Sequence, residues 1–103
     1  MEILKPYRKK IDDLDDRIVD LLVARTEIIR EVALLKHHEK IPAVLQDRVD
    51  EVRERAAARA AARGLDPDLV RRLYAELIDY SCNLEDEIMG ALDQKDIKSA
   101  ARR

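Results

Sequence analysis

The stretch that decides the fold is LLVARTEIIREVALLK, residues 21–36, where apolar side chains recur every three or four positions. This spacing is typical of one face of an α-helix. The same pattern begins near Pro6, so we expect one helix from Pro6 to Lys36 or slightly beyond. It is interrupted at HHEKIPAV, because Pro42 has no amide hydrogen and disfavours helical geometry in the residue before it. The apolar positions of this helix are Ile11, Leu14, Ile18, Leu21, Leu22, Ile28, Ile29, Val32 and Leu35.

Two further helices are predicted after the break. The second runs from about Leu45 to Arg63 and stops at Gly64, a residue that suits the position just after a helix end. The third begins in GLDPDLV, where Asp66 precedes a proline that suits the first helical position, and it runs to about Leu92. The sequence therefore predicts an all-α fold of three helices with a long first helix.

The composition agrees with a helical domain. The chain has 103 residues, of which 47% are hydrophobic and 41% charged, with two Gly and no Trp or Phe. We expect one domain over residues 1–93 and a polar, frayed tail over residues 94–103. A formal net charge of −2 argues against a nucleic-acid or anionic-membrane partner. No apolar run approaches the roughly 20 residues of a membrane span, and the N-terminal segment lacks a hydrophobic signal core, so we expect a cytoplasmic protein.

Neither a metal nor a cofactor is expected. His37 and His38 fall at the end of the first helix with no partner at ligand spacing, so we interpret them as solvated residues. Cys82 is the single cysteine and is expected to act as a small buried apolar residue.

The length of the first helix predicts an assembly. At 1.5 Å per residue it extends roughly 45–50 Å, whereas a compact 100-residue domain has a radius of gyration of about 13 Å. Two shorter helices cannot cover its apolar face. We therefore expect an intertwined homodimer.

Two cations lie within that apolar face. Arg25 and Lys36 are within about 20° of each other around the helix axis, and buried charge without a partner is costly. The partner anion is either a carboxylate on another helix or a ligand. Arg8 lies about 25 Å along the axis from Arg25, but in an antiparallel dimer the partner's Arg8 would arrive beside it. Arg48, near the Pro42 turn, adds a fourth cation. Three other arginines on the second helix are interpreted as a solvated face: Arg55, Arg59 and Arg63.

The sequence resembles the all-helical chorismate mutase family over residues 5–92. The resemblance rests on YRKKIDDLDDRIVDLLVAR, REVALLK, the P…DRV segment and GLDPDLVRRLYAELIDYSCNLEDEIM. It implies an isomerase of the shikimate pathway and aromatic amino acid biosynthesis that converts chorismate to prephenate without a cofactor. Such an enzyme holds the reactive conformer of a dicarboxylate and stabilises charge on the breaking ether bond, which would explain the cations.

The resemblance also implies roles for the cations. Arg25 of one subunit and Arg8 of the other would bind the two carboxylates of the substrate, with Arg48 assisting. Lys36 would donate a hydrogen bond to the ether oxygen. Arginine suits the first task because its planar fork matches a carboxylate.

Four further positions are assigned by the same resemblance. Ser81 would line the carboxylate side of the substrate. Glu85 stands where many relatives have a Gln that donates to the ether oxygen, so it must be protonated to donate, and activity is expected to fall as pH rises. Val49 and Leu45 stand where some relatives have carboxylates that recognise the C4 hydroxyl, which leaves an apolar C4 subsite.

Two related activities and one unrelated role remain open. The pairing of Arg48 with Val49 after an IPA segment is similar to isochorismate-pyruvate lyases. SCNLEDEIM is similar to 4-amino-4-deoxychorismate mutases. A helical homodimer that serves only as an interaction module would explain the apolar face but not the four cations.

Overall fold

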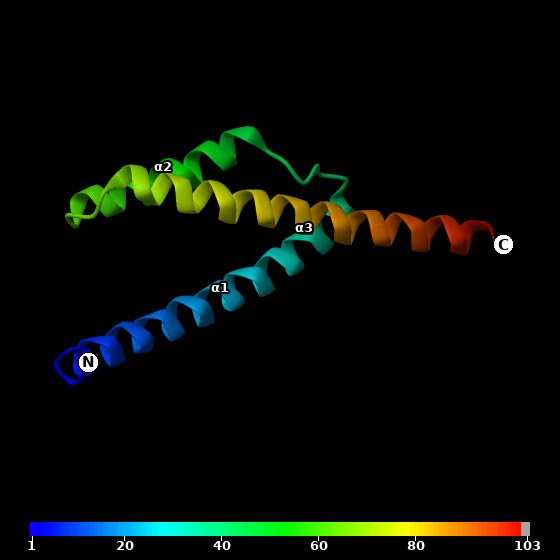
Figure 1. Cartoon of the computed structure of the whole chain (residues 1–103). Helices are drawn as coiled ribbons and strands as arrows, with labels where there is room; N and C mark the ends of the chain where they lie inside the picture. The colour runs from blue at the N-terminus through cyan, green and yellow to red at the C-terminus, as the bar shows by residue number, and fades with distance from the viewer. Residues whose placement is uncertain (102–103) are drawn as a thin grey trace.

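The computed structural model describes residues 1–101, and these residues form only helices (Figure 1). A short 3-10 helix, η1, spans Glu2–Leu4. It leads into α1 (Lys5–Glu39), which is followed by α2 (Gln46–Ala62) and α3 (Pro67–Ala101). This confirms the predicted all-α class with three α-helices and a long first one.

The end of α1 lies where the proline predicted it. Lys40 follows the last helical residue and adopts a left-handed conformation with φ of 58°. The N–H of Ile41 then donates to the carbonyl of Lys36 at 2.8 Å. This hydrogen bond satisfies a carbonyl that the helix end leaves free, and the chain turns toward α2.

The turn between α2 and α3 also follows the predicted signals. Gly64 has φ of +80°, a conformation that costs little for glycine, and the N–H of Leu65 donates to the carbonyl of Ala60 at 2.9 Å. At the start of α3, the Oδ1 of Asp66 accepts a hydrogen bond from the N–H of Asp68 at 2.9 Å. These contacts fix the angle at which α3 returns along α2.

The predicted end of the third helix is wrong. The sequence predicted an end near Leu92 and a frayed tail over 94–103, but α3 continues to Ala101. The last part of that tail, residues 102–103, lies outside the described residues. The reason for the longer helix is visible in the sequence and in one contact. The segment after Leu92 has neither Gly nor Pro, and two of its aspartates lie against His37 of α1.

The three helices form an open V (Figure 1). α3 packs against both other helices, whereas α1 and α2 make no contact with each other within residues 1–101. The radius of gyration is 18.7 Å, well above the roughly 13 Å of a compact domain of this size. The free half of α1 therefore projects away from the rest of the chain.

A single chain has almost no core. Its buried apolar residues are mostly small: Ala33, Ala43, Ala57, Ala60, Val70, Ile78 and Leu84. In α1 the only buried residue is Ala33, and large apolar side chains along its predicted face are at least half exposed: Ile11, Leu14, Ile18, Leu21, Ile28 and Leu35. Among the described residues no helix is both long and apolar enough to cross a membrane.

Candidate active site

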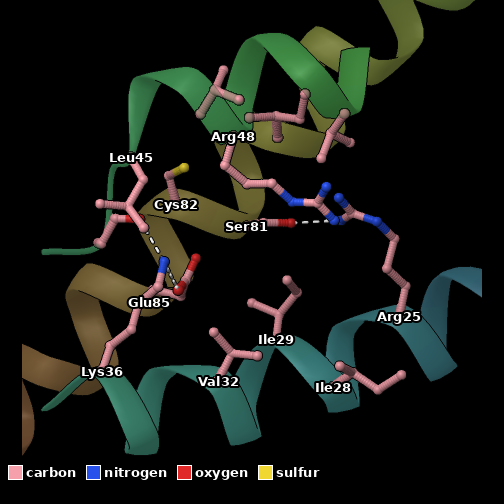
Figure 2. Close-up of a pocket in the computed structure, with 14 residues that line it drawn as sticks. Arg25, Ile28, Ile29, Val32, Lys36, Leu45, Arg48, Ser81, Cys82 and Glu85 are labelled. Carbon is pink, nitrogen blue, oxygen red and sulfur yellow. Dashed lines mark hydrogen bonds and ion pairs between the residues drawn. The ribbon is translucent and has the colours of Figure 1, made fainter. Parts of the chain in front are cut away.

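A pocket of about 310 Å³ lies between α1, α2 and α3 (Figure 2). It is lined by Arg25, Ile28, Ile29, Val32, Lys36, Ala43, Leu45, Arg48, Val49, Val52, Ile78, Ser81, Cys82 and Glu85. Of the site residues predicted from the sequence, only Arg8 is absent from this wall. Arg8 is exposed in the second turn of α1, on the arm of the V that projects away.

Arg25 is held in the pocket without a counter-charge. Its Nη1 donates a hydrogen bond of 2.6 Å to Oγ of Ser81, and that hydroxyl donates in turn to the carbonyl of Leu77 at 2.8 Å. Within residues 1–101 Arg25 makes no ion pair, although it is half-buried. Ser81 therefore orients the guanidinium and leaves its positive charge available to a ligand anion.

Lys36 forms an ion pair with a carboxylate on another helix. Its Nζ lies 2.7 Å from Oε1 of Glu85, and the exposed fractions of the two side chains are 15% and 5%. The same ammonium donates a hydrogen bond of 2.9 Å to the carbonyl of Ala43. Of the two alternatives for the buried cations, the structural ion pair therefore applies to Lys36, while Arg25 lacks such a partner.

The contact between Lys36 and Glu85 is an ion pair and not an aligned hydrogen bond. Glu85 Oε1 is buried and has no hydrogen-bond donor among the described residues, although the ammonium is close. A buried acceptor without a donor is unfavourable. Because Glu85 also lines the pocket, this oxygen could accept a hydrogen bond from a bound ligand.

Arg48 brings a third cation from α2. Figure 2 shows the side chains of Arg48 and Arg25 pointing toward one another from opposite walls. Arg48 also forms an exposed ion pair with Glu51, one turn along α2. Such surface pairs contribute little stability, so a buried anion can displace this one at low cost.

The remaining wall is apolar, and the sequence analysis found only part of it. Leu45 and Val49 line the pocket, and seven further lining residues were not predicted as site residues: Ile28, Ile29, Val32, Ala43, Val52, Ile78 and Cys82. The spacing could have found three of them. Val52 is one turn from Val49, and Ile78 and Cys82 are one turn before Ser81 and Glu85, so they share a helix face.

Cys82 was expected to be a small buried apolar residue, but it is only partly buried. It lines the pocket. Burial raises the pKa of its thiol, and Glu85 raises it further while Lys36 opposes the shift. The thiol is therefore kept protonated near neutral pH and acts as part of the apolar wall.

Two other sequence interpretations change. His37 is not a solvated end: its side chain is 23% exposed and lies between two aspartates of α3. Arg55 and Arg59 are exposed as predicted, but they also line a second hollow beside the pocket, together with Arg48 and Tyr74.

The site and the fold together indicate the class of protein. Cations, one buried carboxyl group and apolar side chains surround a small pocket in an all-helical scaffold, which suits a compact ligand that carries carboxylates. The chain belongs to the chorismate mutase type II family, whose model matches residues 7–86. This is a family of isomerases.

Three of the relatives illustrate the range of similarity within the family. The chain is 32% identical over 84 residues to the 4-amino-4-deoxychorismate mutase of Streptomyces pristinaespiralis, covering 82% of this chain and 65% of that protein. It is 33% identical over 86 residues to the 4-amino-4-deoxychorismate mutase of Streptomyces venezuelae, covering 84% of each. To the chorismate mutase of Methanocaldococcus jannaschii it is 24% identical over 98 residues, covering 95% of this chain and 99% of the relative.

Proposed function

We propose that this chain rearranges chorismate to prephenate in the pocket between its three helices. The observation that supports this best is the convergence of Arg25, Lys36 and Arg48 from two helices on one apolar cavity. A dianion with a hydrophobic ring complements such a cavity in both charge and surface. A volume of about 310 Å³ matches the small end of ligand pockets.

The reaction asks the protein for position and charge, and the pocket residues supply both. One carbon–oxygen bond breaks while a carbon–carbon bond forms within the same molecule, so neither a nucleophile nor a redox group is required. Arg25, oriented by Ser81, and Arg48 would hold carboxylates and so favour the compact reactive conformer. The apolar wall would exclude water and strengthen these charge interactions.

Lys36 and Glu85 would act on the ether oxygen. Negative charge develops there as the carbon–oxygen bond lengthens, and a donor fixed in advance stabilises that charge. Lys36 is fixed by Ala43 and Glu85, at 2.9 and 2.7 Å. Glu85 lies beside Lys36 and could contribute a second hydrogen bond to the ether oxygen only in a protonated form, which its ion pair with Lys36 opposes.

The wall of the pocket and the names of the relatives support a second candidate substrate. Leu45 and Val49 make an apolar wall where some members of the family place carboxylates. The relatives named 4-amino-4-deoxychorismate mutase are more similar in sequence than the one named chorismate mutase. The 4-amino analogue of chorismate, rearranged by the same mechanism, is therefore the second candidate.

We also propose that the working form is an intertwined antiparallel homodimer. The exposed apolar face of α1 needs a cover, and a helix of a second chain packed against it would supply one. In that arrangement the partner's Arg8 would complete the grip on the second carboxylate. The compartment we propose is the cytoplasm, where a free thiol such as Cys82 stays reduced.

A product assay tests the proposed reaction. Purified protein is supplied separately with chorismate, isochorismate and 4-amino-4-deoxychorismate. Prephenate from chorismate supports the leading proposal. Aminoprephenate, or salicylate with pyruvate, would assign the pocket to the amino analogue or to a lyase. Turnover should fall about a hundredfold or more in Arg25→Ala, because a charged bidentate contact is lost. If none of the three compounds reacts or binds although the dimer persists, the interaction module becomes the preferred function.

A mixing experiment tests the shared site. Arg8→Ala and Arg25→Ala chains are each expected to be inactive. After subunit exchange, half of the dimers are mixed and each has one intact pocket, so about one quarter of the wild-type activity should return. Exchange without any recovery would contradict the contribution of Arg8 across the interface.

A further inference from the structure

A second cluster of functional groups lies outside the pocket, where the end of α1 meets the C-terminal part of α3. The Nε2 of His37 is 2.9 Å from Oδ1 of Asp93 and 3.3 Å from Oδ2 of Asp96. All three ligand atoms lie within 4.8 Å of one another. Asp93 and Asp96 are one turn apart on α3, so both carboxylates reach the same imidazole.

Hydrogen bonding alone does not account for this arrangement. An imidazole nitrogen carries at most one proton, and it can direct that proton at one acceptor only. The contact with Asp93 satisfies hydrogen-bond geometry, whereas Asp96 is close to the same nitrogen without such a bond. Two carboxylates gathered at one point also repel each other, and a cation between them would relieve that repulsion.

The distances match the coordination sphere of a metal ion. Two ligand atoms that are each about 2.0–2.1 Å from one ion and subtend 90–109° at it are roughly 2.9–3.4 Å apart. The distances from His37 to the two aspartates, 2.9 and 3.3 Å, lie within this range. The two aspartate oxygens lie within 4.8 Å of each other, and the exposed aspartate side chains can rotate inward to complete the sphere.

We propose that His37, Asp93 and Asp96 bind one divalent transition-metal ion. The donor set of one imidazole nitrogen and two carboxylate oxygens suits Zn²⁺ or Mn²⁺ and is poorly suited to Mg²⁺ or Ca²⁺, which prefer oxygen alone. The aspartate side chains are 66% and 68% exposed, so water can complete the coordination. The ion would connect α1 to the part of α3 that the sequence predicted to be frayed.

The position of the cluster suggests a structural role for the ion. The carbonyls of His37 and Lys36 accept the hydrogen bonds that close α1, and Lys36 also lines the pocket. An ion at His37 would hold the end of α1 against α3 and restrict the backbone that carries Lys36. The cluster shares no residue with the pocket, so this proposal does not depend on the proposed reaction.

Calorimetric titration of the metal-free full-length protein with ZnCl₂, MnCl₂ and MgCl₂ tests the proposal. We expect one saturable Zn²⁺ or Mn²⁺ site per chain, much weaker Mg²⁺ binding, and a higher Tm with the bound ion. His37→Gln and Asp93→Asn should each weaken binding at least about tenfold, since each removes one ligand. Circular dichroism checks that both variants remain folded. Asp93 is exposed, so Asp93→Asn should disturb the fold less than His37→Gln does.

His38→Gln is the matched control. His38 is next in sequence, but its Nδ1 lies against Glu39 at 3.3 Å and it is largely exposed. Its replacement should leave the affinity unchanged. The proposal is overturned if the wild type shows no saturable binding, if binding persists in both His37→Gln and Asp93→Asn, or if His38→Gln abolishes it.

Discussion

Replacing Ile18 by Asp should separate the proposed dimer. Ile18 lies in the middle of the apolar face of α1 and is 54% exposed in the single chain. Full burial of an isoleucine stabilises by about 1.5–3 kcal/mol, so covering this exposed half is worth roughly 1–1.5 kcal/mol per chain. A symmetric dimer contains the position twice, which gives about 2–3 kcal/mol.

The new carboxylate adds a desolvation cost of at least a further kcal/mol or so. Together these terms weaken the dimer by at least about a hundredfold in Kd, at 1.4 kcal/mol per factor of ten. Because the single chain buries no large apolar side chain completely within its described residues, loss of the dimer should also lower the helix content. Sedimentation equilibrium measures the first effect and far-ultraviolet circular dichroism the second.

Val23→Asp is the matched control. Val23 is 52% exposed, close to the value for Ile18, but it lies about 140° away around the helix, among acidic residues. It should leave the dimer intact. A wild-type protein that sediments as a folded monomer, or equal effects of the two substitutions, would refute the reasoning.

Three other predictions follow from local features. Glu85→Gln replaces the carboxylate beside Lys36 by an amide that can donate a hydrogen bond, so activity should persist, and its loss in initial-rate measurements would count against the proposed role of Glu85. Since burial raises the pKa of Cys82, its thiolate is scarce at pH 8, so iodoacetamide should react more slowly than with an ordinary thiol and faster as pH rises; mass spectrometry gives the rate. Gly64→Ala should lower the free energy of unfolding by about 1 kcal/mol, because φ is +80° and the added methyl group would gain no contact within 4 Å. Helical Gly90→Ala should raise it by up to about 1 kcal/mol, and urea unfolding measures both changes.

Local chemistry made much of this fold predictable from the sequence. The helix ends at Pro42, Gly64 and Asp66 follow from hydrogen-bonding and conformational properties of single residues, and each lies within a few residues of its predicted place. The end of α3 was missed because the polar composition after Leu92 was read as a frayed tail although it has no helix-breaking residue, and because its contact with His37 is remote in sequence.

The candidate site, too, was only partly predictable from the sequence. The cations Arg25 and Lys36 were recognisable because charge is unusual within an apolar helix face. The pairing of Lys36 with Glu85 required knowing how α1 packs on α3, which periodicity alone does not give. The same limitation hid the cluster at His37, whose ligands are separated by more than fifty positions in the chain.

The scarcity of large buried side chains in the single chain has a consequence for how the protein is made. A chain with an alanine-rich interior gains little by collapsing alone, so its productive folding step should be the encounter of two chains. Refolding after dilution from denaturant should then be second order, with a half-time that shortens as chain concentration rises. If the proposed dimer forms, newly synthesised copies would remain vulnerable to proteolysis until they meet.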